Sequence, residues 1–297
     1  MLVVLSEDSF HDATTINGRE LHAVTETARL FGCRVVALPP QDFVSNDAEA
    51  ALAYLPSFDP PVTAVWTGYI PSSSWYTEVF EAAHAKGVRL VNSPIQHRTA
   101  MEFDRFYPLL EELTPESRVI TAIDQCAQVA GELSFPLFVK GAVKSNKEQG
   151  WSACVAGTEV ELVAIAKALF ERDTRSRGKV IARRLAGLRH VARDAQGFPL
   201  GREYRVFVYG DQVLTCGFYW DEFPDTQELT PTERAAITRL AIEANRRLQV
   251  TFTAVDVAQL TYGEWIVIEV NDAQFAGLSQ APVLELWGKL AELHAGS

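Results

Sequence analysis

Apolar and polar residues in the first 115 positions alternate between short hydrophobic runs and longer amphipathic stretches. The short runs predict strands at 2–5, 33–38, 63–68 and 88–92, and helical spacing predicts helices at 17–31 and 75–86. A glycine follows each of these two helices, as is typical of helix C-termini. Strand–helix alternation predicts a small parallel sheet with helices on both faces. Ligands of such sheets lie at the carboxyl ends of strands, so the loop 66–76 is a candidate binding loop, with a plain surface loop as the alternative.

The pattern changes near residue 118, where paired strands replace the alternation. The expected strands are 118–122, 136–140, 151–156, 179–185, 202–210, 212–220, 251–260 and 264–270, and the expected helices are 124–131, 159–171, 231–248 and 285–294. A Gly210-Asp211 turn predicts a hairpin between 202–210 and 212–220. A chain of 297 residues is long for one hydrophobic core, so two or three packed units are expected.

Composition narrows the class of protein. The chain is 47% hydrophobic and has no apolar run near the ~18 residues that span a membrane. Its four cysteines are scattered, and its six histidines show no zinc-binding spacing, so we expect a cytoplasmic protein without disulfides, zinc or a membrane partner.

Charge is unevenly distributed along the chain. The formal net charge of −11 argues against nucleic acid as a partner. Residues 140–205, however, hold 14 Lys or Arg against 7 Asp or Glu. This segment favours binding of a small polyanion such as a nucleotide, and a solvated basic face is the alternative.

The stretch WIVIEVNDAQFAGL, residues 265–278, contains a strand that carries two polar residues on one face. Side chains alternate along a strand, so Trp265, Val267, Glu269 and Asn271 are expected on the same face. If the preceding hairpin turns on residues 262–263, paired positions sum to 525, and Asp256 lies directly opposite Glu269.

Opposed carboxylates destabilise a sheet unless a cation lies between them. Asp256, Glu269 and Asn271 offer the hard oxygen ligands that Mg²⁺ prefers, with phosphate oxygens completing the coordination. The pattern therefore predicts a magnesium–phosphate site, and a solvent-exposed polar face is the alternative.

Two further features have phosphate-binding chemistry. Lys140 ends a strand, and the polar loop 141–150 that follows can cover phosphates with backbone N–H groups and lysine charge. Arg205 lies two residues from Glu203 on one face of a strand, where a guanidinium can bind phosphate or carboxylate with two hydrogen bonds. The alternatives are a surface hairpin and a Glu–Arg surface pair.

The order of these features resembles the ATP-grasp superfamily. The resemblance covers nearly the whole chain and is strongest at FTAVD…IEVND (252–272) and PLFVK (136–140). It implies an α/β protein with an ATP-grasp fold and three units. These are an N-terminal Rossmann-like domain at 1–115, a small nucleotide-binding subdomain at 116–184 and a metal- and substrate-binding subdomain at 185–297.

The resemblance also implies roles for residues at matching positions. Asp256, Glu269 and Asn271 match the magnesium ligands, and Lys140 matches the lysine that touches the α-phosphate of ATP. The remaining matches concern ATP or the reacting groups: Lys144, Ser145 and Lys147 in the phosphate-covering loop, Arg183, Arg184 and Leu185 at the adenine edge, His190 near the ribose position, and Arg205, Lys144 and Arg105 as catalytic cations. Arg105 stands where the family usually has lysine, and Arg183-Arg184 where an acidic residue is usual.

Family chemistry gives the expected activity. The resemblance implies an ADP-forming carboxylate–amine ligase that uses ATP and Mg²⁺ and forms an acylphosphate. A small-molecule kinase on the same scaffold and a nucleotide-binding module without chemistry are the alternatives. The loops 66–76, 92–98 and 217–228 are expected to select an amino-acid-like or peptide substrate, and a homodimer is left open.

Overall fold

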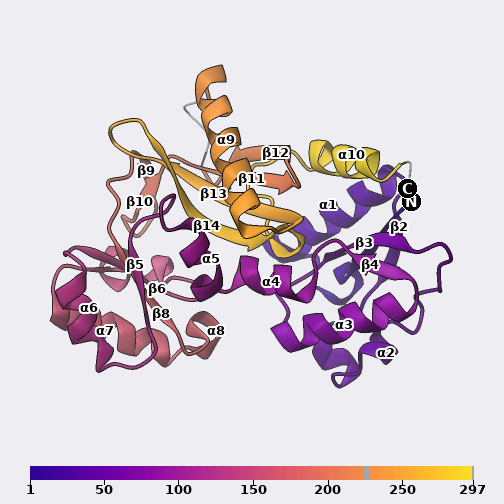
Figure 1. Cartoon of the computed structure of the whole chain (residues 1–297), viewed down its shortest axis with the longest axis horizontal. Coiled ribbons are helices and arrows are strands. Elements are labelled where there is room, and N and C mark those ends of the chain that lie inside the picture. Colours follow the sequence, from indigo (N-terminus) through magenta and orange to yellow (C-terminus); the bar gives the residue numbers. More distant parts are fainter. Residues whose placement is uncertain (224–227, 296–297) are drawn as a thin grey trace.

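A parallel sheet forms the N-terminal part of the computed structural model, which describes residues 1–223 and 228–295. Its strand order is β2 (Arg34–Ala37), β1 (Leu2–Ser6), β3 (Val62–Thr67) and β4 (Val88–Leu90). Helix α1 (Ile16–Leu30) covers one face, and α2 (Ala48–Ala51) and α3 (Ser73–Ala85) cover the other (Figure 1). The predicted parallel sheet with helices on both faces is therefore confirmed.

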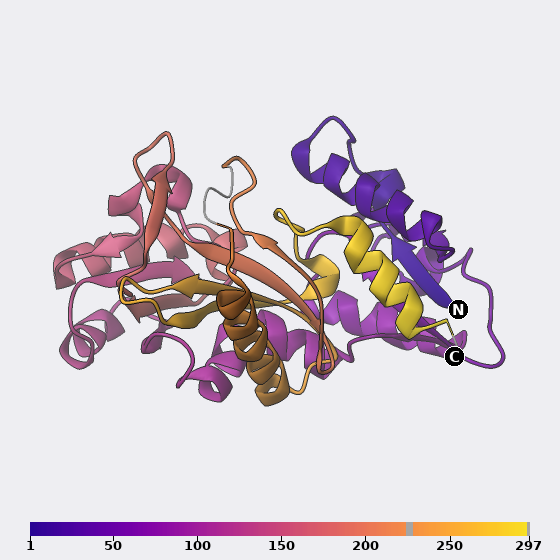
Figure 2. The same ribbon diagram turned by 90° about the horizontal axis from the view of Figure 1, so that it is seen from above.

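The C-terminal helix returns to this sheet. Helix α10 (Val283–Leu293) packs beside α1, and its Trp287 and Leu290 share a buried cluster with Leu2 and Val4 of β1. The amino group of Met1 donates to the carbonyl of His294 at 3.1 Å, and both views place the two ends together (Figures 1 and 2). The last helix of the chain thus completes one face of the first sheet.

A four-stranded antiparallel sheet forms the middle part. Its strand order is β5 (Ser117–Ile120), β8 (Val180–Arg184), β6 (Leu137–Gly141) and β7 (Val155–Ala156). Helices α6 (Gln125–Glu132) and α7 (Glu159–Phe170) bury its outer face, and α8 (Asp173–Ser176) follows them. The predicted strand 151–156 is largely wrong, because residues 151–153 form a 3-10 turn and only two residues pair with β6.

A second antiparallel sheet follows, in the order β12 (Gln212–Phe218), β11 (Glu203–Tyr209), β13 (Phe252–Gln259) and β14 (Trp265–Asp272). Helix α9 (Pro231–Leu248) packs on its outer face, with Thr230 as the expected N-cap. Helices α4 (Pro94–Met101) and α5 (Phe103–Leu110) connect the first sheet to the other two. The hairpin β9 (His190–Arg193) and β10 (Pro199–Gly201), at the left of Figure 1, is absent from the sequence prediction.

The two antiparallel sheets face each other. Ile181 of β8 packs into the same core as Val255 and Val257 of β13. Arg183 of β8 donates to the carbonyl of Ile268 in β14 at 2.7 Å. The inner faces of both sheets therefore line one cleft, and side chains from both reach into it.

One buried ion pair fixes the start of α9 to the sheet and gives a pH-dependent prediction. Arg202 Nη1 donates to Glu233 Oε1 at 2.5 Å, and this bond is the main reason that the pKa of Glu233 is lowered to about 2. A lowered pKa stabilises the fold fully above the ordinary value of 4.5, and the stabilisation is lost as pH falls through about 2.

Glu233→Gln keeps an acceptor for the capping box with Thr230 but removes the charge. We expect it to lower the free energy of unfolding by roughly 1–3 kcal/mol at pH 7. The deficit should shrink steadily between pH 4.5 and pH 2 in urea unfolding. An equal deficit at every pH would show that the ion pair is not its source.

Among the described residues no helix combines the length and the apolar character that crossing a membrane requires. The unit boundaries at 115/116 and 184/185 stay predictions.

Candidate active site

Three charged residues stand in one row across adjacent strands of the second antiparallel sheet. Arg205 on β11 pairs with Asp256 on β13, and Asp256 pairs with Glu269 on β14. The predicted opposition of Asp256 and Glu269 is therefore confirmed. Asn271, two residues further along β14, pairs with Ala254 and borders the same cavity as Glu269.

A bulge, and not the turn alone, sets this register. Near the turn the pairs sum to 524, as in Val257 with Val267, and a bulge between Asp256 and Val257 restores 525 beyond it. The extra residue on β14 reverses the alternation, so Val267 packs in the core under α9 while Glu269 faces the cleft. The expectation that Trp265 and Val267 share the face of Glu269 is wrong for this reason.

Arg205 holds Asp256 with two parallel hydrogen bonds. Its Nε and Nη2 donate to the two carboxylate oxygens at 2.8 Å each, and its Nη1 donates to the carbonyl of Gly277 at 2.8 Å. Both side chains are buried, with 10% and 1% of their surfaces exposed. Burial raises the pKa of Asp256, and Arg205 opposes that rise. The ion pair fixes the plane of both groups at the floor of the cleft.

Lys140 reaches Glu269 from the facing sheet. Its Nζ donates to Glu269 Oε1, joining the end of β6 to β14. Burial acts to raise the pKa of Glu269, but Lys140 outweighs it, and the pKa is lowered overall. Glu269 is therefore an anion, as a metal ligand must be.

Arg183 is a second buried cation in the cleft. It is 5% exposed, stacks over the ring of Phe103 at 5.5 Å, and donates to Ser117 Oγ and the carbonyl of Ile268. Burial lowers its pKa to about 10, and the nearby Glu269 opposes this. Its Nη2 has no hydrogen-bond partner within the described part of the chain, so a polar donor in this cleft is left for another group.

Lys147, from the predicted phosphate-covering loop, lies over aromatic rings. Its Nζ is 4.9 Å from the ring centre of Trp220, 5.8 Å from Tyr219 and 5.9 Å from Phe198. These cation–π contacts hold the loop over the cleft. The lysine also lowers the pKa values of Glu269 and Asp256, so its charge reaches the carboxylates.

Glu203 is a cleft residue whose role sequence reasoning missed. It is 4% exposed, and burial raises its pKa, although Lys147 opposes this. Its position on the face of Arg205 is visible in the sequence, but strand alternation alone assigns it to a surface ion pair. Arg205 pairs with Asp256 instead, which leaves a buried carboxylate in the cleft.

The other predicted residues lie at different distances from this cluster. Lys144 borders the cavity, and the carbonyl of Ser145 accepts from Arg175. The backbone N–H groups of Arg184 and Leu185 donate to Glu116 and Pro136 in the sheet.

Two of the predicted cations lie outside the cluster. Arg105 is exposed and pairs with Glu102 at 2.7 Å on its own helix, and His190 is exposed at the start of β9. The structure does not bring these two side chains to Glu269.

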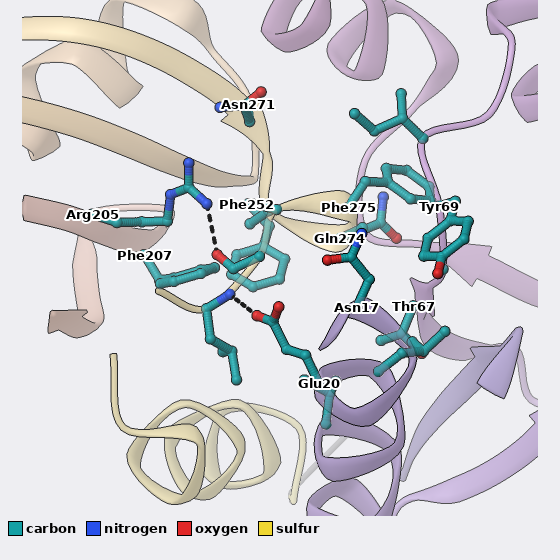
Figure 3. Close-up of a pocket in the computed structure, with 18 of the residues that line it drawn as sticks. Asn17, Glu20, Thr67, Tyr69, Arg205, Phe207, Phe252, Asn271, Gln274 and Phe275 are labelled. Carbon is teal, nitrogen blue, oxygen red and sulfur yellow. Dashed lines mark hydrogen bonds between the residues drawn. The ribbon is translucent and has the colours of Figure 1, made fainter. Parts of the chain in front are cut away.

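A cavity of about 630 Å³ opens beside the row of charges (Figure 3). One wall comes from α1 and from residues 67–70, which belong to the predicted loop 66–76. The opposite wall carries Arg205, Glu269 and Asn271, and Lys144 with Arg177 lies at the rim from the middle part. From the predicted loop 217–228, Tyr219 lines the cavity, and residues 224–227 lie outside the described residues.

The predicted loop 92–98 supports the site from behind. Asp272 is fully buried and accepts from Asn92 Nδ2 at 2.8 Å, lies 2.9 Å from His97 Nδ1, and accepts from the backbone N–H of Gln274 at 3.1 Å. The network ties the end of β14 to the first sheet. It therefore holds Asn271, the neighbouring residue, against the cavity.

Gly68 allows the cavity wall to pass close to Glu7. Glu7 is buried and accepts from Trp66 Nε1 at 3.0 Å and from the backbone N–H of Tyr69 at 3.1 Å. A Cβ atom at position 68 would lie 2.3 Å from Glu7 Cδ, which is too close for any side chain. Because Glu7 is fixed by these bonds, the wall would have to move.

Gly68→Ala is therefore expected to lower the free energy of unfolding by roughly 1–3 kcal/mol. Gly131→Ala is the control, because its Cβ would meet nothing within 4 Å and a helical alanine stabilises slightly. Urea unfolding of both variants tests this. If Gly68→Ala is as stable as the control, Glu7 does not hold the wall.

The oxygen ligands in this site fit a divalent cation. Asp256, Glu269 and Asn271 supply two carboxylates and an amide from neighbouring strands, and each is buried or half-buried. Within the described ranges the Asn271 side chain makes no hydrogen bond, so its oxygen is available as a ligand. Oxygen ligands of this kind suit Mg²⁺ rather than a softer metal.

Comparisons with known proteins agree with this geometry. A family model for an ATP-grasp domain, the third family of its clade, matches residues 129–290. No curated protein matches the sequence.

Solved structures share the whole fold at low identity. A RimK-domain ATP-grasp protein from Sphaerobacter thermophilus is 17% identical, with a TM-score of 0.60 over 99% of each chain. The ATP-grasp ligase PsnB, in complex with a minimal precursor, Mg and ADP, is 16% identical, with a TM-score of 0.59 over 99% of this chain and 96% of that one. D-alanine–D-alanine ligase from Bacillus anthracis is 14% identical, with a TM-score of 0.60 over 99% and 95%.

Proposed function

This chain belongs to the ATP-grasp superfamily, and from that premise we propose that it is an ATP-dependent, ADP-forming carboxylate–amine ligase. The observation that carries the proposal is the set of Asp256, Glu269 and Asn271 beside a cavity of about 630 Å³, with Lys140 facing it from the other sheet. The first three would hold Mg²⁺. When bound, Mg²⁺ neutralises charge on the phosphates and the transferred phosphoryl group.

The reaction has two steps. A carboxylate oxygen of the substrate attacks the γ-phosphorus of ATP, the bond to the β-phosphate oxygen breaks, and ADP leaves. An amine then attacks the carbonyl carbon of the acylphosphate, phosphate departs, and the nitrogen loses a proton to give an amide. The protein positions these groups and supplies charge rather than a covalent nucleophile.

The nucleotide is proposed to lie between the two antiparallel sheets. Lys140 would contact the α-phosphate, and Lys144, Ser145 and Lys147 would cover the phosphates. Arg183 offers its free Nη2 on the adenine side, and the backbone of Arg184 and Leu185 borders the same edge.

Glu203 would accept hydrogen bonds from the ribose hydroxyls, a role in which a buried carboxylate gains partners. His190, exposed on β9, is the weaker ribose candidate.

Among the proposed catalytic cations, Arg205 has the strongest support, because it orients Asp256 and borders the cavity. Lys144 lies at the rim, where it can approach transferred phosphate. Arg105 has the least support, since Glu102 already binds its guanidinium.

The substrates are proposed to be amino-acid-like or peptide molecules that fill the cavity. Two of the similar proteins act as support: PsnB has been solved in complex with a precursor peptide, and an L-amino acid ligase from Bacillus licheniformis shares the fold at 14% identity. The four free cysteines favour the reducing cytoplasm. A homodimer stays a prediction.

One experiment separates the candidate functions. The protein is incubated with ATP, Mg²⁺ and pooled amino acids and short peptides, and nucleotides and new masses are followed by mass spectrometry. ADP with a condensed mass supports the ligase. ADP with a gain of one phosphoryl group indicates a kinase, and ATP binding without any turnover indicates a binding module.

A further inference from the structure

Glu20 connects the N-terminal sheet to the charged row. It lies on the cavity side of α1, and its Oε1 accepts the backbone N–H of Leu278, a residue 258 positions later. Figure 3 shows this bond beside the one from Arg205 to the adjoining carbonyl. The two domains therefore meet at one short loop, residues 276–278.

Gly277 is in contact with both charged groups. Its carbonyl accepts from Arg205 Nη1 at 2.8 Å. A Cβ atom on it would lie 3.4 and 3.5 Å from the two Glu20 oxygens and 3.7 Å from Arg205 Nη1. The peptide between residues 277 and 278 thus has its carbonyl bound to the arginine and its N–H bound to the glutamate.

This peptide links the position of the N-terminal domain to Arg205. The arginine already binds both oxygens of Asp256, so the Gly277 carbonyl is the contact that fixes its remaining nitrogen. A loop held only by Arg205 could rotate this carbonyl away. With Leu278 tethered to α1, the orientation of the guanidinium depends on how the N-terminal domain is seated.

We propose that Glu20 is a positioning residue for Arg205, acting through the 277–278 peptide, so that the site is correctly formed only when the N-terminal domain is docked. The effect on catalysis rests on the proposed function; the tether itself does not. Glu20 acts as a hydrogen-bond acceptor rather than as a charge. Burial and the nearby Asp221 raise its pKa, which disfavours the anion, and either protonation state keeps a carbonyl-type acceptor.

Three variants separate these roles. Glu20→Ala removes the acceptor, Glu20→Gln keeps it without charge, and Glu26→Ala removes an exposed glutamate of the same helix that pairs with Arg29. Thermal unfolding and exchange protection of α9 show whether each variant is folded.

The first measurement is amide hydrogen exchange of the peptide covering residues 276–283, without any nucleotide. Glu20→Ala should speed exchange of the Leu278 amide roughly tenfold, while Glu20→Gln and Glu26→Ala match the wild type. Unchanged exchange in Glu20→Ala overturns the tether.

The second measurement is ADP formation with the substrate mixture that supports wild-type turnover. Glu20→Ala should lower kcat roughly 10–100-fold with little change in KM for ATP, and Glu20→Gln should restore most of the rate. If Glu20→Gln is as poor as Glu20→Ala, the charge acts directly on a substrate and the positioning role is overturned.

The two measurements fail differently. A wild type that forms no ADP defeats the proposed ligase but leaves the exchange result to decide the tether. A wild type that turns over while Glu20→Ala shows normal exchange and normal kcat defeats only the tether.

Discussion

Glu269→Gln is expected to lower the rate of ADP formation by roughly 10²–10³-fold, with the fold intact. The amide has the size of the carboxylate and keeps an acceptor for Lys140, so packing between β6 and β14 survives. It lacks the charge that ligates Mg²⁺ and balances the lysine. Coupled measurement of ADP with ATP, Mg²⁺ and the active substrate mixture gives the rate.

Glu264→Gln is the matched control, because Glu264 lies exposed at the turn of the same hairpin. It should keep the wild-type rate. Unchanged turnover in Glu269→Gln, together with a normal thermal transition, would remove Glu269 from the metal site and would weaken the ligase proposal as a whole.

The extent to which sequence anticipates this site differs between its parts. Opposition of Asp256 and Glu269 follows from pairing around a two-residue turn, and the pairing is correct. The pairs next to the turn have the register 524, however, and the bulge that shifts it is invisible in the residue pattern. Bulges depend on how a strand bends over its neighbours, which is a tertiary property.

Long-range partners are the main element that the pattern cannot supply. The sequence assigns Arg205 and Lys140 to phosphate, but the structure gives each a carboxylate partner, Asp256 and Glu269. Glu20, on an amphipathic helix, carries no signal at all, because its partner Leu278 lies in another part of the chain. Local periodicity predicts which face is polar but not which distant group meets it.

Short elements escape prediction for a related reason. The hairpin β9–β10 has only four and three residues, and its strands lack a continuous apolar face. The predicted strand 151–156 contains enough apolar residues, but Gly150 has a φ of +88° and begins a tight turn there. Periodicity over so few residues is weak compared with the tertiary contacts that decide their conformation.

Arg205→Met is expected to cause the largest loss of stability, roughly 3–5 kcal/mol, because it leaves Asp256 buried without its partner. The loss reflects an uncompensated buried charge and not the net value of the ion pair. The double variant Arg205→Met/Asp256→Asn removes that charge and should recover a large part of the loss, although Asn still needs hydrogen-bond partners.

Urea unfolding of the wild type, both single variants and the double variant gives the coupling free energy between the two residues. Arg205→Lys tests geometry separately, since one ammonium group cannot span both Asp256 oxygens and the Gly277 carbonyl as the planar guanidinium does. It should be intermediate in stability and low in kcat. If Arg205→Met loses less than about 1 kcal/mol, Asp256 is neutral or hydrated in the folded protein, and its place as an anionic metal ligand is lost with it.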